Sequence, residues 1–307
     1  MINSQIKWLS QYITDKDFIF SEIKTTPYSS IFEYQEYGIT YILKTNLSTL
    51  NYEPEITQYL HNLFPEHILP IFLFSHENHC FSTKKVDAIE SHIYFHEQEN
   101  LDLLLKIISK FCEIQNKVSQ QSLIDLHIRN LSFENLTTEF IQAIKGTPYE
   151  QFQDDFSCCH TNIQKDINEL SFLGITNSIE HGDFHLGNIL ITPEHNFIFI
   201  DFAEATITNP FFSLISFIFS LERKLSINHN NPLVDQIKNT YFEKYSAFHQ
   251  ISLNNISKAY SISEKLFNIY YLITILELIK LEPNSQKRKE RFNFHFSQVI
   301  SDYTSKA

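Results

Sequence analysis

The first 86 residues combine short alternating apolar stretches with one helical stretch. Residues 1–20 predict an amphipathic helix that leads into a strand, and residues 30–35 and 38–44 predict a β-hairpin that ends at Lys44. Glu53-Pro54-Glu55 predicts the start of a helix, because proline suits the first turn and acidic residues stabilise its positive end. Residues 71–74 and 80–82 predict a second hairpin. Residues 20–86 are therefore expected to form a small antiparallel sheet with one inserted helix.

After about Val86 the apolar residues recur mainly at helical spacing. The pattern predicts helices over residues 100–118, 140–144, 164–172, 211–221, 235–248, 263–281 and 291–301. Between them, the apolar runs 188–192 and 196–201 predict a hairpin that turns at residues 193–195. The predicted fold class is α+β, with an N-terminal lobe of residues 1–86 and a mainly helical lobe of residues 87–307 that contains the hairpin.

Composition suits a folded protein with a large core. The chain has 307 residues and is 43% hydrophobic, which excludes a disordered polypeptide. No signal-peptide pattern opens it, and its apolar runs are too short or too broken to span a bilayer. The four cysteines lack the spacing of a disulfide framework or a zinc site. We therefore expect a cytoplasmic protein with no membrane partner.

The net charge of −12 arises between residues 87 and 282. Nucleic-acid phosphates need a basic surface, so this distribution argues against a nucleic-acid partner. An acidic central region favours a cationic ligand, but it equally suits a solvated surface that aids solubility.

Three side chains that can bind a metal lie at the ends of the predicted hairpin. Asn188 follows Asp183 by five residues, and Asp201 closes the second strand. Carboxylate and amide oxygens suit hard cations such as Mg²⁺. Lys44, at the end of a strand, precedes the helix that carries Glu53 and Glu55, and such a pair can hold the phosphates of ATP. Together these residues predict phosphoryl transfer.

The segment His181-Gly182-Asp183-x-His185-x-Gly187-Asn188-Ile189-Leu190, with Ile200-Asp201-Phe202-x-x-Ala205, resembles the aminoglycoside phosphotransferase and choline kinase-like family. The resemblance implies a bilobal protein-kinase-like fold. It also implies an ATP- and Mg²⁺-dependent enzyme that phosphorylates a hydroxyl group of a small molecule.

The same resemblance implies roles for individual residues. Asp183 would be the catalytic base, and Asn188 and Asp201 would hold Mg²⁺. Lys44 would contact the ATP phosphates with Glu53, rather than Glu55, as its partner. A hinge at about residues 82–87 would hydrogen-bond adenine through its backbone; its members are Thr83, Lys84, Lys85 and Val86.

The sequence departs from the family pattern in three places. The nucleotide loop within residues 25–30 has no glycine, so Ser29 and Ser30 are the candidates for phosphate contact. Ser213 replaces an aspartate that normally braces the catalytic loop, and Leu186 replaces a common proline. These departures motivate a second hypothesis, in which the chain is a catalytically weak pseudokinase or a nucleotide-binding scaffold.

Other residues near the motif allow more than one interpretation. His181, Asp183 and His185 could form the metal cluster of a hydrolase, but Asn188 and Asp201 would then be unexplained. We expect His181 to be structural, and His185 either to lie near the γ-phosphate or to brace the loop. Glu204 is either a carboxylate that faces the substrate or an exposed turn residue, and we favour the turn residue.

The acceptor is a small molecule with a hydroxyl group, and its identity is left open. Choline, ethanolamine, thiamine, a sugar and an aminoglycoside all fit the motifs. The pocket is expected on residues 150–172 and 222–281, where four tyrosines could cage a cation or simply pack in the core: Tyr241, Tyr245, Tyr270 and Tyr271. The sequence predicts neither the oligomeric state nor a preference for ATP over GTP.

Overall fold

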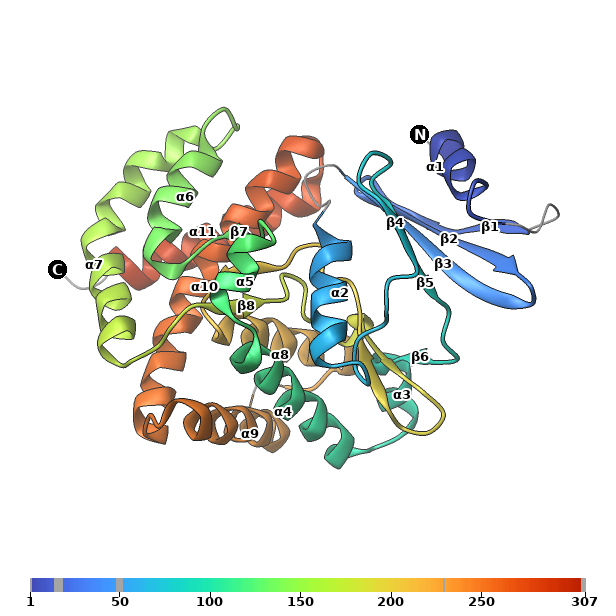
Figure 1. Ribbon diagram of the computed structural model, residues 1–307. Helices are drawn as coiled ribbons and strands as arrows, with labels where there is room; N and C mark the ends of the chain where they lie inside the picture. Colours follow the sequence, from blue (N-terminus) through green and yellow to red (C-terminus); the bar gives the residue numbers. More distant parts are fainter. Residues whose placement is uncertain (1, 14–18, 48–51, 229, 305–307) are drawn as a thin grey trace.

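An antiparallel sheet of five strands forms the N-terminal part of the computed structural model, which describes residues 2–13, 19–47, 52–228 and 230–304 (Figure 1). Its strands have the order β1-β2-β3-β5-β4. They are β1 (Phe20–Thr25), β2 (Ser29–Glu36), β3 (Ile39–Asn46), β4 (Leu73–Ser75) and β5 (Cys80–Lys84). The predicted sheet and both of its hairpins are confirmed. Helix α1 (Ile2–Leu9) covers one face, with Trp8 and Leu9 in a small core with Phe32 and Tyr34.

Helix α2 (Glu53–Leu63) connects the sheet to the rest of the molecule. It begins at Glu53, as predicted, with Pro54 in its first turn. Its buried residues Ile56 and Leu60 belong to the large core of the C-terminal part and not to the small core under the sheet. Figure 1 shows α2 between the sheet and the helices. Glu53 therefore lies where the two parts of the molecule meet.

Helices dominate the remainder of the chain, as the apolar spacing predicts. They are α3 (Ser91–Glu97), α4 (Leu101–Lys117), α5 (Gln120–Asp125), α6 (Leu136–Ile144), α7 (Gln153–Phe172), α8 (Phe211–Leu225), α9 (Pro232–His249), α10 (Leu253–Leu281) and α11 (Gln286–Thr304). Helices α7 and α10 begin about ten residues earlier than predicted. Polar residues dominate these first turns, although buried apolar residues recur there at helical spacing: Phe156 and Cys159 in α7, and Ile256 and Ala259 in α10. None of the helices in the described residues is long and apolar enough to cross a membrane.

Two small sheets hold the central hairpin and the loop before it. Strands β9 (Ile189–Ile191) and β10 (Phe197–Phe199) form the predicted hairpin, and β6 (Ile89–Glu90) pairs with β9. A second sheet has the order β7-β11-β8, from β7 (Arg129–Asn130), β11 (Thr206–Thr208) and β8 (Ser178–Glu180). Strand β8 ends just before His181, and β11 begins shortly after Asp201. The two sheets therefore fix both ends of the segment that carries the candidate chemistry.

Candidate active site

A cavity of about 410 Å³ lies between the N-terminal sheet and the central hairpin. We call it the Lys44 cavity. It brings together most of the residues predicted to bind the nucleotide, and its lining includes Lys44, Glu53, Asp201 and the four hinge residues Thr83, Lys84, Lys85 and Val86. Segments far apart in the sequence therefore meet at one cavity, as the predicted site requires.

Ser29, Ser30 and His185 are the predicted cofactor-binding residues that do not line this cavity. The Ser30 hydroxyl accepts a hydrogen bond from Thr25 at 3.0 Å, and the Ser29 hydroxyl lies 3.4 Å from that of Thr26. Both serines thus stabilise the turn between β1 and β2. His185 lies in the loop between β8 and β9.

Lys44 joins the two parts of the molecule through two ion pairs. Its Nζ lies 2.9 Å from Glu53 Oε1 and 2.5 Å from Asp201 Oδ1. Burial alone would lower the pKa of Lys44, but the charges of Glu53 and Asp201 outweigh it and raise that pKa. Glu55 instead contacts His76 at 2.5 Å. The lysine is therefore firmly charged, and its helix partner is Glu53.

Asp201 adopts a backbone conformation that is uncommon outside glycine, with φ +67°. Burial would raise the pKa of its carboxyl, but the charge of Lys44 outweighs burial and keeps the pKa below its usual range. The side chain is 40% exposed despite the ion pair. An ionised carboxylate with a free, accessible side is what a hard cation requires.

The candidate catalytic loop, residues 181–188, has at its second position a glycine, Gly182, that no other residue could replace without rearrangement. Gly182 has φ +85°, and a Cβ atom there would lie 2.0 Å from the carbonyl oxygen of Glu204. The loop and the chain after Asp201 therefore pass each other in backbone contact.

Gly182→Ala is expected to lower kcat by at least about tenfold, since both strain and collision would displace Asp183. The measurement is kcat compared with that of Gly146→Ala. Gly146 also has a positive φ (+69°), but a Cβ atom added to it would meet no atom within 4 Å. Equal losses in the two variants would show that backbone strain alone, and not the contact with Glu204, is responsible.

Asp183 and Asn188 are held together within the loop. Asn188 donates from Nδ2 to the backbone carbonyl of Asp183 at 2.9 Å, which leaves its side-chain oxygen for another partner. His185 accepts the Gly187 N–H at Nδ1, so the neutral ring carries its proton on Nε2, which lies 3.2 Å from Asp183 Oδ2. Burial would raise the pKa of Asp183, but His185 outweighs it and lowers that pKa. His185 thus braces an ionised Asp183.

His181 is buried beneath the loop and takes a structural position. Its Nε2 lies 3.0 Å from the carbonyl oxygen of Ile200, the residue before Asp201. Burial lowers the pKa of His181 to about 4, so the ring is neutral and donates this bond. The ring is therefore engaged with the backbone and does not join Asp183 and His185 in a metal cluster.

Ser213 stands where the family pattern has an aspartate, and it contacts the carboxyl of Glu180. The sequence did not identify Glu180 as a candidate. The Ser213 hydroxyl donates to Glu180 Oε2, and it accepts the backbone N–H of His181 at 3.4 Å. Glu180 is 1% exposed. The signal in the sequence is a charged residue directly before the His181-Gly182-Asp183 motif.

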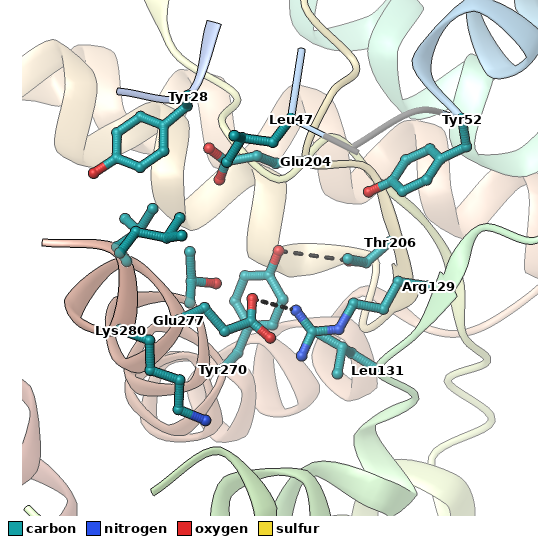
Figure 2. Close-up of a pocket in the computed structure, with 13 residues that line it drawn as sticks. Tyr28, Leu47, Tyr52, Arg129, Leu131, Glu204, Thr206, Tyr270, Glu277 and Lys280 are labelled. Carbon is teal, nitrogen blue, oxygen red and sulfur yellow. Dashed lines mark hydrogen bonds and ion pairs between the residues drawn. The ribbon is translucent and has the colours of Figure 1, made fainter. Parts of the chain in front are cut away.

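A second cavity, of about 500 Å³, lies beside the first, and we call it the Glu204 cavity. Figure 2 shows Tyr28, Leu47 and Tyr52 along one side, and residues of α10 along the other. The lining also includes Arg129, Leu131, Glu204, Thr206, Tyr270, Thr274, Glu277, Leu278, Lys280 and Leu281.

Glu204 faces this cavity, so the expectation of an exposed turn residue is wrong. Burial, followed by the charges of Asp183 and Asp201, raises the pKa of Glu204 to about 8. Glu277 is paired with Arg129 at 2.6 Å, whereas no ion pair joins Glu204 to a described lysine or arginine. Glu204 is therefore the acidic group of the cavity that is free to meet a ligand.

The tyrosines expected near an acceptor divide into two groups. Tyr270 lines the Glu204 cavity and lies 3.5 Å from the Thr206 hydroxyl. Tyr241 and Tyr245 are buried in the large core, and Tyr271 packs against the ring of His295. Residues 150–172, also expected at the acceptor pocket, do not line this cavity.

The segment that contains the candidate catalytic loop is similar to a known family. Residues 175–249 match the model of the phosphotransferase enzyme family. The predicted family resemblance is confirmed. The phosphotransferase segment carries Asp183, Asn188 and Asp201, and agrees with the predicted class of enzyme. It ends before α10, so much of the Glu204 cavity lies outside the match.

Solved structures share the fold over nearly the whole chain. Choline kinase LicA from Streptococcus pneumoniae has a TM-score of 0.66 at 13% identity, and the alignment covers 97% of this chain and 99% of that one. An ethanolamine kinase from Plasmodium vivax has a TM-score of 0.67 at 11% identity, covering 94% and 84%.

Wild-type aminoglycoside 2'-phosphotransferase-IIIa in its GDP complex has a TM-score of 0.62 at 13% identity, covering 100% and 99%. A search of curated protein sequences gave no match. The structural matches establish the predicted bilobal, protein-kinase-like α+β fold.

Proposed function

We propose that this protein is a kinase that transfers the γ-phosphoryl group of ATP to a hydroxyl group of a small cationic molecule. The observation that carries the proposal is that residues lining two separate cavities, Asp201 in one and Glu204 in the other, lie near each other and near Asp183. Asp201 lines the Lys44 cavity, and both aspartates are close enough to Glu204, in the other cavity, to raise its pKa. A donor and an acceptor could thus approach the same pair of carboxylates.

The Lys44 cavity would hold the nucleotide. Lys44, fixed by Glu53, would contact the phosphates, and residues 83–86 at the end of β5 would hydrogen-bond the base. The division of the chain near residue 86 is part of this proposal, because the base would then lie against the connection between the lobes. The related structures support a nucleotide site, since they include complexes with GDP and AMP.

The donor set beside this cavity fits Mg²⁺. Asp201 offers an ionised carboxylate, and Asn188 offers a side-chain oxygen because its amide nitrogen is engaged with Asp183. One or two such side chains together with phosphate oxygens make a usual magnesium site. When bound, Mg²⁺ would neutralise charge on the transferring phosphoryl group.

Asp183 would accept the proton of the attacking hydroxyl. Its carboxylate is oriented by His185 and kept ionised by a lowered pKa, so it is in the form that can accept a proton. Lys44 would balance the charge of Asp201, so that two neighbouring carboxylates remain ionised.

The Glu204 cavity would hold the acceptor. Glu204 supplies a carboxyl group whose ionised form a bound cation would favour, and Tyr52 and Tyr270 supply aromatic rings that can interact with a cation. The Tyr28 ring already faces the guanidinium of Arg288, which lies 5.0 Å from the ring centroid. The related kinases are named after choline, ethanolamine and aminoglycosides, and each of these combines a hydroxyl group with a cationic nitrogen.

Above pH 8, where Glu204 is ionised, Glu204→Gln is expected to raise the KM for a cationic acceptor by about 10-fold or more, because a negative charge beside the bound cation is lost. The value of kcat and the KM for ATP should change little. With choline, whose charge does not titrate, wild-type KM should fall as pH rises toward 8, because Glu204 ionises through its raised pKa of about 8. This pH dependence should disappear in Glu204→Gln. The matched control is Glu194→Gln, at an exposed turn, and equal KM values in all three proteins would refute the assignment.

The function itself is tested by ADP release with MgATP and MgGTP. The acceptors are choline, ethanolamine, thiamine, kanamycin and glucose. The proposal predicts turnover with at least one cationic alcohol and faster turnover with it than with glucose. Nucleotide binding without turnover of any acceptor would instead support the pseudokinase hypothesis.

A further inference from the structure

A buried carboxyl lies directly before the catalytic loop, and the proposed function leaves it without a role. Glu180 is the last residue of β8, and its side chain is almost completely enclosed. A carboxyl in such surroundings is costly unless it is hydrogen-bonded or paired. Burial raises the pKa of Glu180 to about 8. The groups that act against this rise are the Ser213 hydroxyl and backbone N–H groups, and none of them is a lysine or an arginine.

The partners of this carboxyl belong to the two elements that meet under the loop. The Ser213 hydroxyl donates to Oε2 from the first turn of α8. The backbone N–H groups of Gly182, Ser213 and His181 also act on the carboxyl and lower its pKa. Oε1 makes no hydrogen bond of good geometry with the described residues. The carboxyl is thus surrounded by donors from the start of the loop and the start of α8.

These contacts continue to both candidate catalytic aspartates. His181 lies two residues before Asp183, and its backbone N–H donates to the Ser213 hydroxyl. The His181 ring donates to the Ile200 carbonyl, one residue before Asp201. A single buried network therefore runs from Glu180 through Ser213 and His181 to the backbone on either side of the site.

We propose that Glu180 is a positioning residue, whose carboxyl holds the backbone of the catalytic loop through Ser213 and His181 and so sets the places of Asp183, Asn188 and Asp201. Ser213 reaches the loop with a hydroxyl group, and Glu180 supplies the carboxyl group from the opposite side of this contact. The inference rests on the proposed function for the identity of the metal-binding residues.

The test measures binding of AMP-PNP by calorimetry, with Mg²⁺ and with the metal removed. Glu180→Met keeps the side-chain volume and removes the carboxyl. It should weaken Mg²⁺-dependent binding by about 10- to 100-fold, as expected when the groups that orient metal-binding residues are lost. Metal-free binding should stay unchanged, because Lys44 and residues 83–86 are untouched. The melting temperature should fall, because the Ser213 hydroxyl and the nearby backbone N–H groups lose a buried acceptor.

Returning a carboxylate on the other side of the contact should restore the effect of Mg²⁺. Glu180→Met combined with Ser213→Asp is therefore expected to recover most of the Mg²⁺-dependent affinity. The matched control is Thr147→Val, which removes a buried hydroxyl that donates to Ile144 at 2.6 Å, away from the loop. It should lower the melting temperature without changing the effect of Mg²⁺.

Three outcomes separate this inference from the proposed function. If Glu180→Met keeps the full effect of Mg²⁺, or if the double variant is no better than Glu180→Met, the inference is wrong and the proposed function stands. If the wild-type protein does not bind AMP-PNP more tightly with Mg²⁺, both fail. Ser213→Ala, a smaller change, covers the case in which Glu180→Met does not fold. It should weaken Mg²⁺-dependent binding roughly fivefold, and an unchanged value would overturn the inference.

Discussion

Asp183→Asn is expected to lower kcat by about 10²- to 10⁴-fold, the usual contribution of a positioned general base. An amide cannot accept the proton of the attacking hydroxyl, although it can still accept a hydrogen bond from His185. Nucleotide binding should change little, because Asp183 does not line the Lys44 cavity. The measurement is steady-state turnover together with calorimetric binding of AMP-PNP.

The matched control is Asp154→Asn, an exposed aspartate in the first turn of α7. It should leave kcat within about twofold of the wild-type value, since surface substitutions rarely disturb a distant site. If Asp183→Asn behaved like this control, another group would have to be the base.

Lys44→Met is expected to remove activity and also to lower the free energy of unfolding by about 3–5 kcal/mol. The reason is the fully buried Glu53, whose side chain is 2% exposed and would lose its cationic partner. Asp201, at 40% exposure, would be solvated more easily and contributes less to the loss. Urea denaturation of the variant and the wild-type protein measures the difference.

A second substitution separates the two effects of losing Lys44. Lys44→Met combined with Glu53→Gln leaves no unpaired carboxylate in the buried contact, so part of the stability should return while activity stays absent. If Lys44→Met unfolds at the same urea concentration as the wild-type protein, the ion pair with Glu53 does not stabilise the fold.

Residues whose roles depend on local spacing were predicted from the sequence. The hairpin that presents Asn188 and Asp201 follows from two apolar runs and a turn, and the helix that begins at Glu53 follows from its proline and acidic first turn. Lys44 and Glu53 then meet because a strand and the next helix are close in sequence. Local patterns of this kind therefore account for the Lys44–Glu53 pair and for the hairpin, each of which lines part of the Lys44 cavity.

Residues whose roles depend on packing between distant segments were not predicted. Glu204 faces a cavity because Tyr28, Arg129 and the end of α10 enclose it, and these segments lie far apart along the chain. Glu180 lies in a strand of three residues, which is too short to show a period. In both cases burial raises the pKa of the carboxyl, and this burial arises only when distant segments pack together in the fold.

The central claim is that one phosphoryl group passes from the Lys44 cavity to a hydroxyl group in the Glu204 cavity. Mass spectrometry of the acceptor, run alongside ADP measurement, tests this most directly. With wild-type protein, MgATP and the cationic alcohol that gives turnover, we predict one phosphorylated acceptor for each ADP formed, and almost none with Asp183→Asn. Formation of ADP without phosphorylated acceptor, or equal product from wild type and Asp183→Asn, would contradict the account.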